Sequence, residues 1–184
     1  MRVIAGRFKS RRLKTLRGLR TRPTSDRLRE TLFNVLGPSV AGAVFADCYA
    51  GSGAVGIEAL SRGAAQVYFL ENFRPATQVI RDNLSRLGVQ TGYEILPLDV
   101  PAGLRRLEGR SVRLNIVFLD PPYQAAGEYE RTLQWLGKAT LLAPEAYVIA
   151  EHARPQTLAE RYGALARTRT LRQGDTVLSF FRQE

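Results

Sequence analysis

Three glycines and two carboxylates in the first half of the chain have a spacing that suits a nucleotide-like ligand. The stretch D-C-Y-A-G-S-G-A-V-G, from Asp47 to Gly56, contains G-x-G-x-x-G, and Glu71 follows twenty residues after its first glycine. Such glycines let the backbone approach a ligand and let the next helix pack closely on its strand. On spacing alone, the pattern fits a dinucleotide site in which Glu71 accepts hydrogen bonds from ribose hydroxyls.

The acidic residue that precedes the glycines favours a different ligand. Asp47 lies four residues before Gly51, at the end of a predicted strand, where its carboxylate would repel a pyrophosphate. The same carboxylate would attract the ammonium and sulfonium groups of S-adenosylmethionine. Glu71 suits either ligand, and Asp99, after the third predicted strand, could contact an adenine amino group. The loop therefore favours a methyl donor, with NAD as the alternative.

A second motif, Asp120-Pro121-Pro122-Tyr123, follows the fourth predicted strand. Two consecutive prolines donate no backbone hydrogen bond and hold the chain extended, so the neighbouring carbonyls have fixed directions. A carboxylate and such a carbonyl present two acceptors to one amino group, and the tyrosine offers a face on which a base can stack. The motif predicts recognition of an exocyclic amine, although D-P-P by itself also suits a rigid turn after a buried strand.

The elements that must position these residues alternate between short apolar runs and helical patterns. The predicted strands cover 44–49, 66–71, 93–96, 114–119 and 147–150, the predicted helices 55–62, 75–87, 101–107 and 128–136, and a final hairpin 164–171 and 176–181. This alternation predicts an α/β fold: a Rossmann-like, mostly parallel seven-stranded sheet with helices on both faces and a C-terminal antiparallel hairpin. Ligands bind such sheets at the carboxyl ends of the strands, where the acidic residues lie.

The positive charge of the chain is concentrated in a predicted N-terminal extension, residues 1–37, before the domain of residues 38–184. Residues 1–30 hold eleven Lys and Arg and two acidic residues, which is nine of the ten net positive charges. This is the electrostatic footprint of a protein that neutralises phosphates; a solvated surface or a transit peptide are the alternatives. The predicted RNA-binding residues are Arg7, Lys9, Arg11, Arg12, Lys14, Arg22, Arg27 and Arg29.

The local pattern of this extension predicts a β-hairpin followed by a helix. Two partly alternating runs, R-V-I-A-G and R-F-K-S-R-R-L-K-T-L, favour short strands. Thr24 or Ser25 would cap the helix, and Gly37-Pro38 would end it. The apolar stripe of the helix comprises Leu28, Leu32, Phe33, Val35 and Leu36.

Composition narrows the class of protein further. With 45% apolar residues, no apolar run long enough to span a bilayer and no signal-peptide pattern, we expect a folded cytoplasmic protein. The single cysteine, Cys48, excludes an intrachain disulfide and a multi-cysteine zinc site, and no cluster of metal ligands is evident. A packing role is expected for Cys48, for the single histidine His152 and for Trp135.

The motifs in this order resemble the class I S-adenosylmethionine-dependent methyltransferases, whose amino-methylating members carry N/D-P-P-Y/F. More narrowly, the chain resembles the bacterial 16S ribosomal RNA guanine-N2 methyltransferases of the RsmD type. The likeness extends from R-V-I-A-G-R-F-K-S-R-R-L through R-P-T-S-D-R-L-R-E-T-L-F-N-V-L and D-C-Y-A-G-S-G-A-V-G-I-E-A-L-S-R-G-A to D-P-P-Y. The family usually has Phe where Tyr49 stands.

The resemblance implies methyl transfer from S-adenosylmethionine to a guanine N2 in 16S rRNA, within the 30S subunit or an assembly intermediate, by a monomer without a metal. The implied cofactor-binding residues are Asp47, Tyr49, Ala50, Gly51, Ser52, Gly53, Glu71, Asn72, Asp99 and Val100. The implied catalytic residues are Asp120, Pro121, Pro122 and Tyr123. The alternatives are amino-methylation of adenine N6 or of a protein glutamine amide, a non-catalytic RNA-binding module, and an NAD-binding oxidoreductase.

Overall fold

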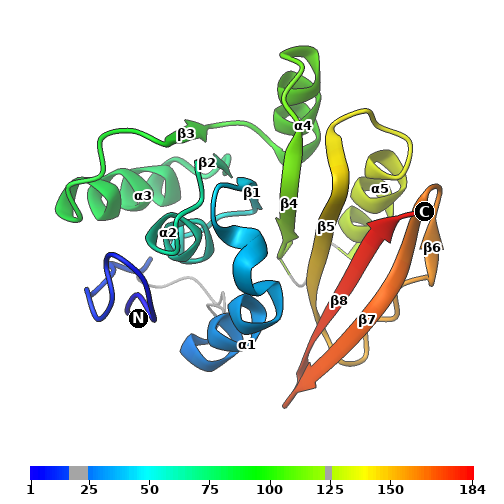
Figure 1. Ribbon diagram of the computed structural model, residues 1–184, viewed down its shortest axis with the longest axis horizontal. Helices are drawn as coiled ribbons and strands as arrows, with labels where there is room; N and C mark the ends of the chain where they lie inside the picture. Colours follow the sequence, from blue (N-terminus) through cyan, green and yellow to red (C-terminus); the bar gives the residue numbers. More distant parts are fainter. Residues whose placement is uncertain (17–24, 123–125) are drawn as a thin grey trace.

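A single eight-stranded sheet organises the computed structural model, which describes residues 1–16, 25–122 and 126–184, Ala126 by its backbone only. The strands lie in the order β3-β2-β1-β4-β5-β8-β7-β6, parallel from β3 to β5 and antiparallel beyond β5 (Figure 1). Their bounds are β1 Val44–Cys48, β2 Gln66–Leu70, β3 Tyr93–Leu96, β4 Leu114–Leu119, β5 Leu142–Ala153, β6 Arg161–Tyr162, β7 Leu165–Gln173 and β8 Thr176–Gln183.

The predicted Rossmann-like α/β fold with its C-terminal antiparallel hairpin is confirmed, with two differences in the strands. The described residues form eight strands rather than seven, because β6 has two residues and is too short to leave a periodic pattern. Strand β5 begins five residues before the predicted 147, on the far side of Pro144 and of Glu145, which has a φ of 62°. These two residues interrupt the regular pairing of β5 with β4. The apolar pattern of the sequence therefore does not show that β5 is continuous.

Helices cover both faces of this sheet. They are α1 Asp26–Leu36, α2 Ala54–Ser61, α3 Arg74–Arg86, α4 Val100–Gly109 and α5 Ala126–Leu136, with the short 3₁₀ helix η1 at Gly37–Val40. One hydrophobic cluster joins the sheet to α1, α2 and α3, and a second joins its other face to α4 and α5. Burial on both faces explains why the central strands are continuous apolar runs.

Helix α1 forms as its sequence predicts. The Ser25 hydroxyl accepts a hydrogen bond from the Leu28 amide at 3.2 Å, which caps the first turn, whereas Thr24 lies outside the described residues. The apolar stripe packs on the sheet, with the Phe33 ring stacked 6.3 Å from that of Phe45. Gly37 ends the helix at a φ of 50°, and its amide bonds to the Phe33 carbonyl.

The first sixteen residues, which we call the basic segment, do not form the predicted pair of strands. A single antiparallel bridge joins Arg2 to Arg12, flanked by backbone hydrogen bonds from Val3 to Arg11 and from Leu13 to Met1, and residues 5–10 between its two sides form bends and turns. The two runs do pair in antiparallel fashion, but over one bridge rather than over two strands, because the apolar residues Val3, Phe8 and Leu13 are buried in the core beside α1 and α2 instead of alternating across a ladder.

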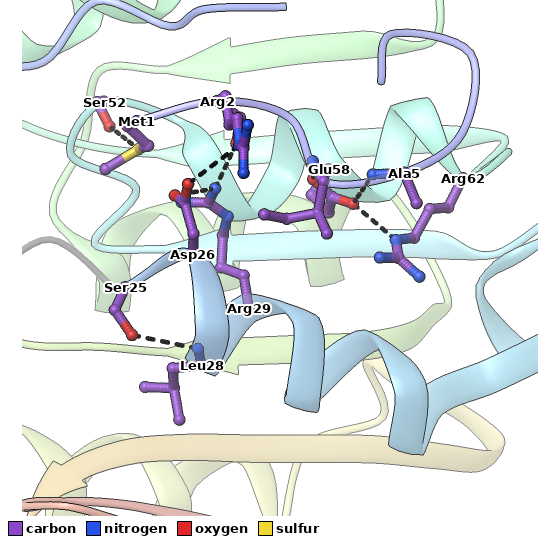
Figure 2. Close-up of polar contacts among 11 residues, drawn as sticks. Met1, Arg2, Ala5, Ser25, Asp26, Leu28, Arg29, Ser52, Glu58 and Arg62 are labelled. Carbon is purple, nitrogen blue, oxygen red and sulfur yellow. Dashed lines mark hydrogen bonds and ion pairs between the residues drawn. The ribbon is translucent and has the colours of Figure 1, made fainter. Parts of the chain in front are cut away.

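Two buried polar side chains of α2 hold this basic segment in place. The Glu58 carboxylate accepts hydrogen bonds from the Ile4 amide at 2.8 Å, the Ala5 amide at 3.0 Å and Arg62 Nε at 2.7 Å (Figure 2). The Ser61 hydroxyl donates to the Ala5 carbonyl at 2.6 Å and accepts from an amide of the same segment at 2.9 Å. The basic segment is therefore an ordered part of the fold.

The glycine loop depends on a close approach between α2 and the sheet at Gly56. A Cβ at this position would lie 2.3 Å from a ring carbon of Phe69 and 2.9 Å from a methyl carbon of Val67, so the helix could not keep its position. Gly56 thus fixes where the amino end of α2, and the loop before it, meet the strand ends.

Replacing Gly56 by Ala should destabilise the protein by about 1–3 kcal/mol, because the added methyl overpacks a rigid core. Thermal unfolding of both variants measures the effect. The matched control is Gly109→Ala at the end of α4, where an added Cβ meets nothing within 4 Å, and its stability should stay unchanged or rise slightly. Equal melting temperatures for the two variants would contradict the proposed close approach.

Glu58→Gln should loosen the basic segment specifically, because a glutamine oxygen replaces a carboxylate that accepts from two backbone amides. Hydrogen bonds to charged groups contribute about 1.5–3 kcal/mol, so amide exchange at Ile4 and Ala5 should accelerate tenfold or more while the sheet stays protected. The control is Glu94→Gln, which breaks a surface pair with Arg110. If residues 1–16 exchange equally slowly in both variants, Glu58 does not anchor them.

Candidate active site

The candidate active site lies where the strand order reverses. Strand β1 lies between β2 and β4, so their carboxyl ends form one edge of the sheet, with β3 next in line. Asp47 belongs to β1, Glu71 follows β2, and Asp120 follows β4. The sheet topology therefore brings together residues from separate motifs.

The loop from Tyr49 to Gly53 folds over the end of β2, with Tyr49, Gly51 and Ser52 partly exposed. The amides of Tyr49 and Ala50 both donate to the Leu70 carbonyl, at 3.0 and 3.2 Å. Tyr49, Gly51 and Gly53 have φ values of 63°, 54° and 75°, which form a compact left-handed turn before α2. A Cβ on Gly51 would meet only the Tyr49 carbonyl oxygen, at 4.0 Å, so the space beside this glycine can hold a ligand.

Asp47 lies in the core and bonds to the backbone of α2 just after this loop. Its side chain is buried, with 2% of the residue exposed, and its Oδ2 accepts a hydrogen bond from the Gly56 amide at 2.8 Å. Burial raises the pKa of Asp47 to about 8; the bond from Gly56 opposes the rise and the charge of Glu71 adds to it. A cationic ligand near this carboxyl group would favour its ionised form.

Glu71 and its neighbours connect the loop to the following helices. The Glu71 carboxylate accepts from the amides of Gly51 and Phe73, at 2.9 and 2.8 Å, and keeps lone pairs for further donors such as ribose hydroxyls. Asn72 beside it is exposed. Asp99 caps α4 by accepting from the Ala102 amide at 2.7 Å, and the buried Val100 follows it.

The described part of the proline motif directly follows β4. Asp120 is half-buried, Pro121 is buried and Pro122 is exposed, whereas Tyr123 lies outside the described residues. Tyr49 joins the glycine loop to α5 beyond this motif, because its hydroxyl donates to Glu128 Oε2 at 3.0 Å. Burial raises the pKa of the Tyr49 phenol, so it stays a donor at neutral pH. No local pattern in the sequence indicates this pairing, because it joins residues far apart in the chain.

One predicted RNA-binding residue has a structural position instead. Arg29 is fully buried, and its guanidinium donates to the Arg2 carbonyl at 2.5 Å and to Asp26 Oδ1 at 3.0 Å (Figure 2). The expectation that Arg29 faces a ligand is wrong, because the basic segment covers that side of α1. The remaining predicted residues that the structure describes are exposed: Arg7, Lys9, Arg11, Arg12, Lys14 and Arg27. Arg22 lies outside the described residues.

Asn83 of α3 is a further residue that sequence reasoning did not identify. It is buried; its Nδ2 donates to the carbonyls of Ser52 and Lys14, both at 3.1 Å, and its Oδ1 accepts from the Lys14 amide at 2.8 Å. A polar residue on the buried stripe of an amphipathic helix was the available signal. Asn83 ties the basic segment directly to the glycine loop.

The histidine and the cysteine have packing positions. His152 is buried, with Nε2 2.9 Å from the Ser179 hydroxyl, and burial lowers its pKa. Burial also raises the pKa of the Cys48 thiol, which keeps it protonated. Within residues 1–16, 25–122 and 126–184, no three His, Cys, Asp or Glu side chains gather in a way that could hold a metal. In the same part of the chain, no helix is long and apolar enough to cross a membrane.

The raised pKa of Asp47 predicts how the ligand-free protein responds to pH. Because its pKa rises from 3.8 to about 8 on folding, its contribution to stability is complete below 3.8 and disappears as the pH rises through 8. Relative to Asp47→Asn, the wild type should lose up to about 1.4 kcal/mol of unfolding free energy per pH unit between these values. Denaturant titrations across this range measure the difference. With the exposed Asp175→Asn as control, parallel curves for all three proteins would contradict the prediction.

Comparison with known proteins gives consistent matches over the whole chain. Residues 1–182 match the family described as Conserved hypothetical protein 95. The chain is 38% identical over 151 residues to Ribosomal RNA small subunit methyltransferase D of Escherichia coli (strain K12), covering 82% of this chain and 74% of that one. It is 34% identical over 183 residues to YlbH of Bacillus subtilis (strain 168), covering 100% and 99% of the two chains.

Solved structures agree with these relatives. The structure of yhhF from Escherichia coli has a TM-score of 0.86 and 31% identity, covering 100% of this chain and 98% of that one. SMU.776 complexed with SAH has a TM-score of 0.68 and 12% identity over 85% of this chain and 48% of that one, which shows a shared fold only. The strand-end carboxylates, the glycine loop and the proline motif lie at one edge of the sheet. In agreement with this arrangement and with these matches, the chain belongs to the RsmD-type family of methyltransferases.

Proposed function

We propose that this protein transfers a methyl group from S-adenosylmethionine to the exocyclic N2 amine of a guanine in 16S ribosomal RNA. The observation that carries the proposal is the position of Asp120-Pro121-Pro122 at the end of β4, directly beside the β1 strand that leads into the glycine loop. The name of the Escherichia coli relative, which specifies small-subunit ribosomal RNA, supports the choice of substrate.

The strand ends suit the cofactor chemically. Open space beside Gly51 admits a ligand against the loop backbone, and Glu71 offers acceptor lone pairs to ribose hydroxyls. Asp47 is buried, and no cation among the residues that the structure describes forms an ion pair with it. A positively charged ligand would lower its raised pKa. A dinucleotide would instead bring a pyrophosphate to this acid. When bound, S-adenosylmethionine supplies an electrophilic methyl group on its sulfonium.

The protein's contribution to the reaction is orientation and charge placement. Guanine N2 is a poor nucleophile because its lone pair is delocalised into the ring. Asp120 and the Pro121 carbonyl accept its two hydrogens, favour a more tetrahedral nitrogen and direct its lone pair to the methyl carbon. The carboxylate of Asp120, which is half-buried, can also take up the proton that nitrogen loses and pass it to water.

The substrate base must leave its stack to reach Asp120, and Tyr123 provides the aromatic face for the displaced base. This requirement favours looped RNA or RNA exposed in an assembling 30S subunit, which the enzyme meets as a cytoplasmic monomer. The exposed cations of the basic segment, together with Arg22 and Arg27, hold the RNA backbone and contribute affinity more than base identity.

Asp120→Ala should lower the rate of labelled-methyl transfer to undermethylated 30S subunits by about 10²- to 10³-fold, because one of two acceptors for the amine is lost. Asp120→Asn keeps an acceptor oxygen and should retain intermediate activity. Affinity for S-adenosylhomocysteine, measured by calorimetry, should stay unchanged in both variants.

The exposed Asp175 on the β7–β8 turn provides the matched control, and Asp175→Ala should keep wild-type activity. Full activity of Asp120→Ala would refute its role. Nucleoside analysis of the product RNA identifies the acceptor: methyl groups on adenine N6 rather than guanine N2 would overturn the proposed substrate.

A further inference from the structure

A groove of about 640 Å³ runs along the C-terminal hairpin of the sheet. One wall is formed by β7 and β8, and the other by residues 154–160, which connect β5 to β6. The charged residues of the lining are four arginines and one glutamate: Arg154, Arg167, Arg169, Arg172 and Glu160. Residues 31–184 are nearly neutral overall, so the fold concentrates positive charge at this groove.

Most of this positive charge is available to a partner. Arg154, Arg169 and Arg172 are exposed, and none forms an ion pair with any residue that the structure describes. Arg167 is half-buried and forms an ion pair with the exposed Glu160. The hydroxyls of Thr157 and Thr170, which also line the groove, add uncharged donors. Guanidinium forks and hydroxyls are the donor set that phosphate groups require.

The groove adjoins the candidate active site. Its inner wall includes His152, two residues after Ala150, which pairs with Leu119, the residue before Asp120. The Tyr129 ring of α5 packs edge-on against His152, with the centroids 6.2 Å apart. In Figure 1 the N-terminal segment and the β7–β8 hairpin, the two elements rich in Arg and Lys, lie on either side of α1.

We propose that this groove binds backbone phosphates of the substrate RNA, as a second contact on the side of the active site away from the basic segment. The inference rests on the proposed function for the identity of the RNA. A polyanion that crosses the strand ends would meet the basic segment, then Asp120, then Arg154 and Arg172. The lining offers charges and hydroxyls, which suit a polyanion rather than an apolar partner. The exposed large hydrophobic residue among those that the structure describes is Phe73, which lies before α3 and does not line the groove.

The test compares two triple variants that remove equal charge. Arg154→Ala/Arg169→Ala/Arg172→Ala empties the groove of its unpaired cations, and Arg105→Ala/Arg106→Ala/Arg113→Ala removes exposed arginines on and after α4. Binding to a 16S rRNA fragment is measured over a series of salt concentrations. The groove variant should bind roughly tenfold or more weakly, with a log–log salt slope reduced by about two to three. The α4 variant should stay within about threefold of wild type, and S-adenosylhomocysteine affinity and melting temperature should be unchanged in both.

The outcomes separate this inference from the proposed function. Equal losses in the two variants would mean a general charge effect and would overturn the groove contact, as would wild-type binding by the groove variant. If the wild type methylates 30S subunits while the groove variant binds RNA normally, the reaction stands and the groove does not. If the groove variant loses RNA affinity but the wild type transfers no methyl group, the contact stands and the proposed reaction fails.

Discussion

The close contact between α2 and the sheet is the constraint on which the rest of the site depends. Gly56 brings the helix against Phe69 and Val67, and its amide is held by the Asp47 carboxylate at 2.8 Å. This contact fixes the amino end of α2, so the preceding loop must turn through left-handed conformations over the end of β2. The backbone conformation of the glycine loop is therefore set by the packing of α2 on the sheet.

The same helix also holds the basic segment in place. Glu58 and Ser61, one and two turns beyond the glycine loop, bind the backbone of the basic segment, and Asn83 bonds both that segment and Ser52. A buried polar network of this kind is costly unless every member is satisfied, which gives the segment one position. The cations are thereby presented at a fixed place relative to the loop.

Local pattern predicted much of this architecture because the buried parallel strands are apolar runs and the helices carry continuous stripes. It failed where the position of a side chain depends on a partner that is far away in the sequence. Arg29 lies on the buried stripe of α1, three and four residues before Leu32 and Phe33, although its charge favours exposure. The basic segment covers it and supplies its acceptor, the Arg2 carbonyl. Val3, Phe8 and Leu13 show only a weak alternating pattern in the sequence. Their position depends on a core that is made mostly of residues later in the sequence.

The sequence by itself determined the fold class, the family and the identity of the motifs, because G-x-G-x-x-G and D-P-P-Y are local and keep their chemistry wherever they lie. Only the tertiary structure decided which groups share an environment. Burial beside Glu71 raises the pKa of Asp47, Tyr49 pairs with Glu128, and arginines spread over β7 and the 154–160 segment converge on one groove. Each depends on contacts between strands and helices far apart in the chain, and pairwise proximity of that kind is set by the packed core rather than by local pattern.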